Sequence, residues 1–341
     1  MRLEAFMKDL IDQAVQDRKY AYRTGMSWSD WRSQLKEHFQ ERLGAIPTQR
    51  AELQPELLES TSFDDYVRER IEITTYEGMR MPIYLLIPKE ADATRSAVIA
   101  IHGHGYGSRE IVGIEPDGSE RVNTAGLHKD FAVELVKKGH VVAAPELFGF
   151  GDRRLHAELT ADDPKKSSCA FLSAQLMSIG QTIAGFRVYE TQRVVDYLQT
   201  RLDVDPQRIG IMGISGGGLV AGFTAAIDER ISSAVVSGYA STFTDSVLFR
   251  LHCLDNYIPG ILQDAEMPDL LGLIAPRGLF IESGDSDQVF PQEFARKAYG
   301  QLRDIYEAAQ FPENLAVDFF QGGHEIHGTL AYAWLQEQLK K

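Results

Sequence analysis

Six short apolar segments, separated by stretches long enough to form helices, are the feature that most constrains the fold of this 341-residue chain. Each segment is almost continuously apolar, which is typical of strands buried on both faces. Such strands form a parallel sheet covered by helices. The sequence therefore predicts an α/β fold with a mostly parallel central sheet flanked by helices. The segments are Ala97–Ile101, Val141–Ala144, Ile209–Met212, Ala234–Val236, Leu279–Ile281 and Leu315–Phe320.

An alternating segment precedes these buried segments. Polar and apolar residues alternate over Arg70–Thr74, and apolar residues return over Met81–Ile87 after Glu77 and Gly78. Alternation with period two is typical of a strand with one buried face, and the glycine marks a turn. The sequence therefore predicts an antiparallel hairpin near the start of a domain that spans residues 66–341.

The first part of the chain, residues 1–65, has the apolar spacing of helices. Ser27 has the chemistry of an N-cap for a second helix, and Gly44 has that of a stop. We therefore expect an N-terminal helical extension. Its apolar stripe should pack on a neighbouring core; a contact between subunits of a homo-oligomer and a cap over the active site are the alternatives. The stripe of the first helix contains Leu3, Phe6, Met7, Leu10, Ile11, Ala14 and Val15.

Residues 239–276 form an insertion between two predicted strands and are long enough to hold helices of their own. Long insertions at strand ends are common places for binding sites and lids. We expect this insertion to lie over the pocket and to close a small acyl site with its apolar side chains. These side chains are Phe243, Leu248, Phe249, Leu251, Leu254, Tyr257, Ile258 and Leu262.

Composition excludes some classes of partner and compartment. The formal net charge of −14 argues against nucleic acid, whose phosphates would be repelled. The two cysteines, Cys169 and Cys253, make no disulfide framework and fit a reducing cytoplasm. Apolar segments are too short to span a bilayer, and the start at Met1 lacks a signal-peptide pattern. We expect a cytoplasmic protein without a membrane partner.

The segment Gly213-Ile214-Ser215-Gly216-Gly217 follows an apolar segment and precedes a helical stretch. A serine at a sharp strand-to-helix turn needs glycine on both sides, because a Cβ there would clash. The turn also places the hydroxyl near a helix N-terminus, where developing negative charge is favoured. This context predicts Ser215 as a nucleophile. The alternative is a glycine-rich turn with an incidental serine.

A serine hydroxyl is a poor nucleophile until a base removes its proton. Asp287 follows the fifth apolar segment, and His324 follows the sixth. Both are then expected at the carboxyl ends of parallel strands, where open α/β sheets build their sites. We expect His324 to move the proton and Asp287 to orient it. His327 competes with His324 for the role of base, and Asp285 competes with Asp287 for the role of acid.

The first apolar segment continues as Ile101-His102-Gly103-His104-Gly105, which favours an oxyanion hole. One donor is expected to be the backbone N–H of Gly216, after the nucleophile. The second is expected to be the N–H of His104, with that of Gly105 as the close alternative. The side chains of His102 and His104 also suggest a metal site. The sequence offers them no clear third ligand, so no metal and no cofactor is expected.

Three further residues have reactive groups without a supporting motif. Glu146 follows a predicted strand and is a candidate for the pocket wall, although a surface carboxylate is the commoner outcome. Cys169 and Cys253 lack the nucleophile-elbow context. They are therefore expected to be packing residues.

Residues 67–341 resemble the α/β-hydrolase superfamily, and more narrowly its dienelactone hydrolase and acetyl xylan esterase-like branch. In that pattern the acid precedes Val and Pro, which matches Asp287. Dienelactone hydrolases proper use a cysteine nucleophile, so Ser215 argues against their substrate. The motifs that carry the resemblance are His102-Gly103-His104-Gly105, Gly213 to Gly218, Gly284 to Asp287 with Pro291, and Gly323-His324.

The resemblance implies a serine carboxylic-ester hydrolase that forms an acyl-enzyme on a small-molecule ester with a short acyl group, such as acetate on a sugar. Two other classes share parts of the pattern. A serine peptidase of the prolyl oligopeptidase kind would suit Gly213 to Gly217 equally, but the N-terminal region is too short for a propeller. A non-enzymatic ligand-binding protein on the same fold would have no need of all three residues of a triad.

Overall fold

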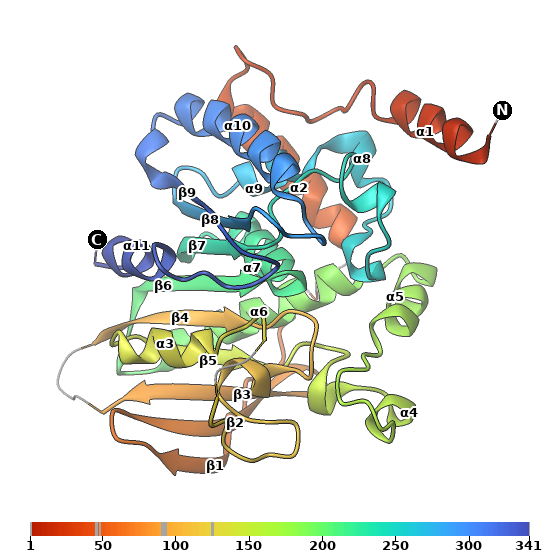
Figure 1. Ribbon diagram of the computed structural model, residues 1–341. Coiled ribbons are helices and arrows are strands. Elements are labelled where there is room, and N and C mark those ends of the chain that lie inside the picture. The colour runs from red at the N-terminus through yellow and green to blue at the C-terminus, as the bar shows by residue number, and fades with distance from the viewer. Residues whose placement is uncertain (1, 45–46, 48, 90–93, 124–125, 341) are drawn as a thin grey trace.

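A nine-stranded sheet runs through the computed structural model, in the order β1-β2-β3-β5-β4-β6-β7-β8-β9 (Figure 1). The structure describes residues 2–44, 47, 49–89, 94–123 and 126–340. The six apolar segments form β4 to β9, and neighbouring strands among them pair in parallel. The predicted α/β fold is confirmed. The strands are β1 (Glu56–Ser62), β2 (Tyr66–Tyr76), β3 (Met79–Pro88), β4 (Arg95–Ile101), β5 (Val141–Pro145), β6 (Val204–Ile214), β7 (Ile231–Ser237), β8 (Gly278–Gly284) and β9 (Leu315–Phe320).

The predicted hairpin forms the antiparallel edge of this sheet. Strands β2 and β3 pair antiparallel, and β3 joins the parallel part through β5. Between β2 and β3, Gly78 adopts a φ of +75°, a conformation that favours glycine. The hairpin is therefore confirmed.

Helices cover both faces of the sheet and bury two apolar cores. Helices α3 and α11 pack on one face through Phe131, Leu135 and Leu335, and they lie in front of the sheet in Figure 1. Helices α2, α6 and α7 contribute to the core on the opposite face. The helices are α1 (Leu3–Ala14), α2 (Trp28–Leu43), α3 (Phe131–Lys137), α4 (His156–Leu159), α5 (Cys169–Ser178), α6 (Ile183–Thr200), α7 (Gly216–Ile227), α8 (Ile261–Asp264), α9 (Met267–Gly272), α10 (Gln292–Ala308) and α11 (Ala331–Gln338).

The second N-terminal helix is part of this core. Ser27 caps α2 by accepting a hydrogen bond from the Asp30 N–H, and Gly44 ends the helix with a φ of +105°. The buried face of α2 packs into the core, where the ring of Phe39 meets Phe223 edge-on at 4.9 Å. The expected packing of an apolar stripe is confirmed for α2. Its buried side chains are Trp31, Leu35, Phe39 and Leu43.

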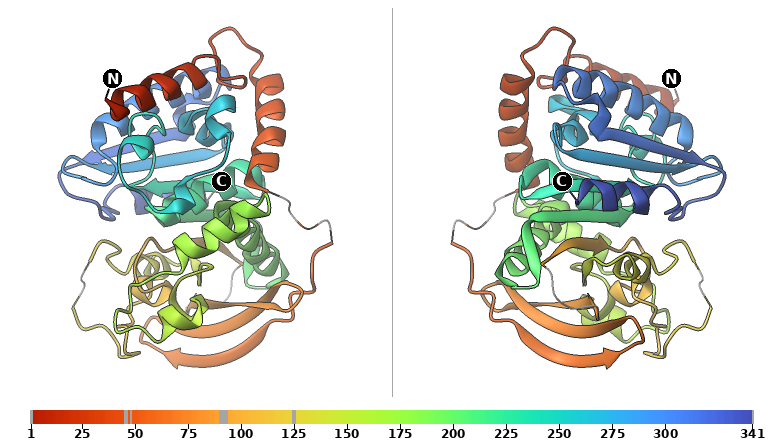
Figure 2. Two further views of the ribbon diagram at one scale, coloured as in Figure 1. Left: turned by 90° about the vertical axis from the view of Figure 1, so that its right-hand side faces the viewer. Right: turned by 90° about the vertical axis from the view of Figure 1, so that its left-hand side faces the viewer.

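The first helix differs from this expectation. Helix α1 has no buried residue, and the side chains of Leu3 and Phe6 are 71% and 49% exposed. It lies at the periphery in both views of Figure 2, whereas α2 stands against the body of the protein. The expected packing is therefore wrong for α1, because amphipathic spacing alone does not supply a partner surface.

The helical expectation is also wrong for residues 56–62, which form the edge strand β1. All seven of its residues are exposed, so the sequence has no alternation of buried and exposed positions that would predict a strand. The pairing of β1 with β2 decides its conformation. The division of the chain at residue 65 stays a prediction. Its outer limits, residues 1 and 341, lie outside the described residues.

Across the described ranges, no single helix is both long and apolar enough to cross a membrane. The pair α5 and α6 passes that test together, but the two helices are bent by 100° at their junction.

Candidate active site

The predicted site residues come together at the carboxyl ends of parallel strands. Ser215 directly follows β6, and His104 lies in the loop after β4. Asp287 and His324 follow β8 and β9, which pair with each other. Four segments far apart in the sequence therefore meet at one edge of the sheet.

Ser215 occupies a strained turn between β6 and α7. Its φ of +57° and ψ of −125° are unusual for a residue with a side chain, and such strain is common at functional sites. A Cβ on Gly213 would collide with the carbonyl oxygen of Gly217, and one on Gly217 with that of Ile101. The predicted need for glycine on both sides is confirmed. The turn holds Ser215 at the N-terminus of α7.

Asp287 and His324 form a hydrogen-bonded pair in which the aspartate is buried and the histidine is partly exposed. His324 Nδ1 lies 2.8 Å from Asp287 Oδ2. The other carboxylate oxygen accepts the backbone N–H groups of Val289 and Phe290 at 2.7 and 2.8 Å. Because the carboxylate accepts, Nδ1 carries the proton and Nε2 is left as an acceptor. Within the described residues, no hydrogen bond joins the Ser215 hydroxyl to His324.

The competing candidates for the base and the acid, His327 and Asp285, make other contacts. His327 Nδ1 lies 2.6 Å from Asp318 Oδ2, and its ring stacks on Phe320. Asp285 is exposed, and its carboxylate accepts the Gly322 N–H at 3.1 Å. Neither contacts His324, so the geometry favours Asp287 over Asp285 as its partner.

The two backbone N–H groups expected to form an oxyanion hole are available. Gly216 is the first residue of α7 and has no intrahelical acceptor. No hydrogen bond occupies the N–H of Gly216 or of His104 in the part of the chain that the structure describes. Both residues line the same pocket as Ser215.

Buried polar side chains support the loop that carries His104. The Gly103 N–H donates to His128 Nε2 at 2.8 Å, and burial lowers the pKa of His128, which keeps its ring neutral. Three residues after Gly103, the N–H of Tyr106 donates to Glu110 at 3.0 Å. Glu146 accepts both the N–H and the hydroxyl of Ser108, at 3.0 and 2.9 Å.

Glu146 corrects one sequence expectation. The carboxylate is not at the surface but almost fully buried, 3.3 Å from His102 Nε2. It lies behind the loop and is not among the residues that line the pocket. Its contacts with the loop mark it as a supporting group.

A pocket of about 220 Å³ opens beside Ser215. Part of its wall belongs to the insertion, which therefore borders the pocket as expected, through Leu251, His252, Cys253 and Asn256. Larger hollows of about 410 and 500 Å³ lie beside Glu77 in the β2–β3 turn, away from the predicted site residues. The pocket is lined by His104, Leu127, Ser215, Gly216, Leu251, His252, Cys253, Asn256, Val289, Phe290 and His324.

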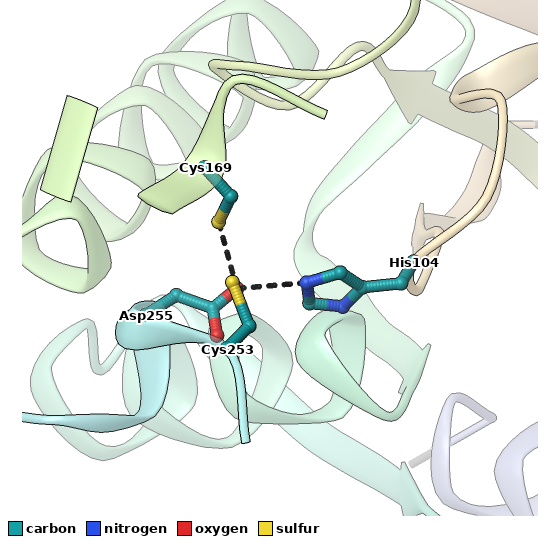
Figure 3. Close-up of side chains that lie close together, drawn as sticks. All are labelled: His104, Cys169, Cys253 and Asp255. Carbon is teal, nitrogen blue, oxygen red and sulfur yellow. Dashed lines mark hydrogen bonds and ion pairs between the residues drawn. The ribbon is translucent and has the colours of Figure 1, made fainter. Parts of the chain in front are cut away.

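A polar cluster behind His104 was missed by the sequence reasoning. Side chains of His104, Cys169, Cys253 and Asp255 converge there (Figure 3). Burial lowers the pKa of His104, but the charge of Asp255 together with the contact with Cys169 raises this pKa overall. The pKa of the Cys169 thiol is raised, chiefly by its contact with Cys253 and also by burial. Both cysteines pack in or against the apolar core, as expected, and Cys169 Sγ also contacts Asp255 and Arg187.

A second group of potential metal ligands lies under the sheet edge. Glu282, Asp318 and His327 bring one donor atom each within 4.8 Å of one another. Their donors are already engaged: His327 pairs with Asp318, and Glu282 accepts from the Ser237 hydroxyl and the Gly328 N–H. This group is explained by its internal hydrogen bonds.

Comparison with known proteins places the chain in a family. A family model described as the Abhydrolase family matches residues 6–322. The protein named "Putative hydrolase YtaP" from Bacillus subtilis strain 168 is 29% identical over 273 residues, which cover 77% of this chain and 84% of that protein.

Solved structures share the fold at low sequence identity. A Bacteroides fragilis protein described as a "putative acetyl xylan esterase" superposes with a TM-score of 0.84 at 16% identity, covering 100% of this chain and 95% of that one. A glucuronoyl esterase from Solibacter usitatus superposes with a TM-score of 0.67 at 15% identity, covering 94% and 97%. The predicted resemblance to α/β-hydrolases is confirmed.

Proposed function

Because this chain belongs to the Abhydrolase family, we propose that it is a serine carboxylic-ester hydrolase that works through an acyl-enzyme. The observation that carries the proposal is the 2.8 Å contact between His324 Nδ1 and Asp287, on loops beside the strained turn at Ser215. The names of the relative and of the two superposed esterases support it.

The proposed reaction is acyl transfer in two steps. Ser215 Oγ attacks the ester carbonyl while His324 Nε2 accepts its proton, and Asp287 stabilises the resulting imidazolium. The N–H groups of Gly216 and His104 hold the negative oxygen that develops. His324 then protonates the leaving alcohol. Water, activated in the same way, releases the acid and restores the serine.

The proton transfer requires a hydrogen bond between the Ser215 hydroxyl and His324 Nε2, and both residues line the same pocket. Hydrogen bonds of this kind are commonly loose in the free enzyme and tighten when substrate binds. His324 is held at Nδ1 and 14% exposed, so its Nε2 edge is accessible from the pocket.

The proposed substrates are esters with short acyl groups, on a sugar or another small alcohol. The pocket of about 220 Å³ supports this, since it leaves little room beside the two loops. The superposed proteins are described as acetyl xylan and glucuronoyl esterases, which makes carbohydrate esters the first class of substrate to test. The expected cytoplasmic location and homo-oligomeric state stay predictions.

Substitution of Ser215 by alanine tests the proposal. We expect Ser215→Ala to lower kcat with p-nitrophenyl acetate by about 10⁴-fold or more, because triad members act as a unit. Ser178→Ala, at an exposed serine at the end of α5, is the matched control and should keep full activity. Circular dichroism should show both variants folded.

Near-normal ester hydrolysis by Ser215→Ala would overturn the mechanism. A peptide p-nitroanilide assayed in parallel should be cleaved poorly; a preference for that amide over the ester would instead indicate a peptidase. A serine-directed phosphonate should label Ser215 alone, as read by peptide mass spectrometry.

A further inference from the structure

The two cysteines of this chain, distant in sequence, meet beside the pocket. Cys169 begins α5, and Cys253 belongs to the insertion. Their sulfur atoms lie within 4.8 Å of each other and of donor atoms of His104 and Asp255. Figure 3 shows the four side chains pointing toward one centre from three separate segments. The residue set, two thiols with an imidazole and a carboxylate, is one that Zn²⁺ prefers.

The measured separations fit a tetrahedral ion. His104 Nε2 lies 3.6 Å from Asp255 Oδ2, and Cys169 Sγ lies 3.4 Å from the same oxygen. Zinc bonds of about 2.0–2.3 Å at tetrahedral angles give ligand–ligand edges of about 3.3–3.7 Å. These two separations are therefore close to those that a bound ion imposes, and all four donor atoms lie within 4.8 Å of one another.

One donor atom of the cluster lacks a hydrogen bond. The ring of His104 is partly exposed to the pocket, but its Nε2 is buried and has no hydrogen-bond partner among the described residues. An unpaired buried nitrogen costs free energy. Asp255 is almost fully buried, and its second oxygen accepts from Asn256 Nδ2 at 2.8 Å, which fixes the carboxylate.

The buried guanidinium of Arg187 completes the charge balance. Arg187 donates to Asp255 Oδ2 at 2.8 Å and to Cys169 Sγ at 3.2 Å. Hydrogen bonds from outside to ligating atoms are usual around metal ions. Three anionic ligands are then offset by the divalent ion and by Arg187, so the occupied cluster is neutral.

We propose that His104, Cys169, Cys253 and Asp255 bind Zn²⁺. His104 supplies Nε2, the cysteines supply thiolates, and Asp255 supplies one carboxylate oxygen. Binding converts two thiols to thiolates and releases two protons, with no change of oxidation state. The expectation of no metal rested on the lack of a third ligand, which two distant cysteines and an aspartate supply.

The bound ion would tie three segments together. It links the loop that carries the His104 N–H to α5 and to the insertion at Cys253. His104 and Cys253 line the pocket, whereas Cys169 and Asp255 lie buried behind it, so the ion would hold part of the pocket wall in place and we assign it a structural role. The site does not depend on ester hydrolysis, so metal binding and the proposed function fail separately.

Titration of the reduced, metal-free full-length protein with Co²⁺ tests the site. One equivalent should bind and give thiolate-to-cobalt absorption in the near ultraviolet, with the intense visible bands of a tetrahedral ion. Zn²⁺ should abolish both. Metal analysis of the dialysed protein should find one Zn²⁺ per chain after incubation with the ion.

Cys253→Ser is the decisive variant, because Cys253 is only half-buried and its change is mild. It should lose the absorption of one thiolate and weaken binding by more than the ~10–100-fold that changes outside the ligand sphere cost. Cys169→Ser should behave alike. His327→Gln, in the second group of potential ligands, is the matched control and should leave stoichiometry and spectrum unchanged.

Three results of the binding experiments would overturn the proposal. They are a cobalt spectrum without thiolate absorption, full binding by Cys253→Ser, and loss of binding in His327→Gln. A Cys169–Cys253 disulfide that persists in the presence of reductant would also overturn it. Ester hydrolysis by the metal-free protein decides nothing about the site, so the two proposals remain distinguishable.

Discussion

At the residue scale, the contrast between Asp287 and Asp285 gives the sharpest test of the triad. Asp287 is buried against His324, whereas Asp285 is exposed and contacts only the neighbouring backbone. Asp287→Asn should therefore lower kcat for p-nitrophenyl acetate by about 10⁴-fold, because the wrong imidazole tautomer is then favoured. Asp285→Asn should change kcat little.

The reverse ranking of these two variants would place the acid at Asp285. The histidines provide a second comparison of the same kind. His324→Ala should be nearly inactive, while His327→Ala, which loses only its pair with Asp318, should retain kcat.

At the scale of elements, the insertion forms part of the pocket wall. Four of its residues, Leu251, His252, Cys253 and Asn256, line the pocket together with Val289 and Phe290 from the loop after β8. Several apolar residues expected there, among them Phe243 and Tyr257, instead line a separate hollow of about 260 Å³. The insertion was placed correctly from the sequence, but its lining residues were only partly predicted.

A pocket of this size should select short acyl groups. Each methylene that fits contributes about 0.8 kcal/mol, whereas overpacking costs about 1–3 kcal/mol. We expect kcat/KM to fall from acetyl or propionyl through butyryl to octanoyl p-nitrophenyl esters, by tenfold or more. Val289→Ala should flatten this fall, and Phe249→Ala, outside the pocket lining, should not. A preference for octanoyl esters would refute the short-acyl assignment.

At the scale of the whole molecule, a buried histidine makes folding sensitive to acid. His140 hydrogen-bonds Ser96 at 2.7 Å, and its Nε2 is buried without a partner among the described residues. Burial, helped by Lys138 and Arg208, lowers the pKa of His140 from 6.5 to about 4. The unfolded chain therefore binds this proton more tightly than the folded one, and stability is lost as pH falls through that window.

The variant His140→Gln should remove this part of the acid sensitivity. Urea unfolding at about pH 7 and about pH 4 should show that the wild type loses ~3 kcal/mol more than the variant. His156→Gln, at an exposed histidine, is the control and should follow the wild type. Equal losses in all three proteins would show that His140 is not the group responsible.

Much of the fold and part of the candidate site followed from local patterns. Apolar segments predicted β4 to β9, because burial on both faces leaves its mark on consecutive residues. The glycines around Ser215 predicted the turn for a similar reason, since the clash of a Cβ is set by near neighbours. Asp287 and His324 were placed by strand order, and the structure brings them into contact; their roles stay predictions.

Other features were decided only by contacts between distant segments. The edge strand β1 has no buried face, so its sequence lacks the alternation of polar and apolar residues that marks a half-buried strand. Pairing with β2 sets its conformation. Helix α1 has a marked apolar stripe and yet stays exposed, because a stripe specifies a face and not a partner.

His104 shows most clearly the difference between what the sequence determined and what the tertiary structure decided. Its place in the loop after β4 was determined by the sequence alone, since a strand end and two glycines fix the local backbone. Which side chains surround its imidazole ring was decided by the tertiary structure. Cys169, Cys253 and Asp255 reach it from α5 and the insertion, and only the packing of those segments against the sheet sets the distances between them. Local conformation depends on neighbours along the chain, whereas a side-chain cluster depends on how the whole chain packs.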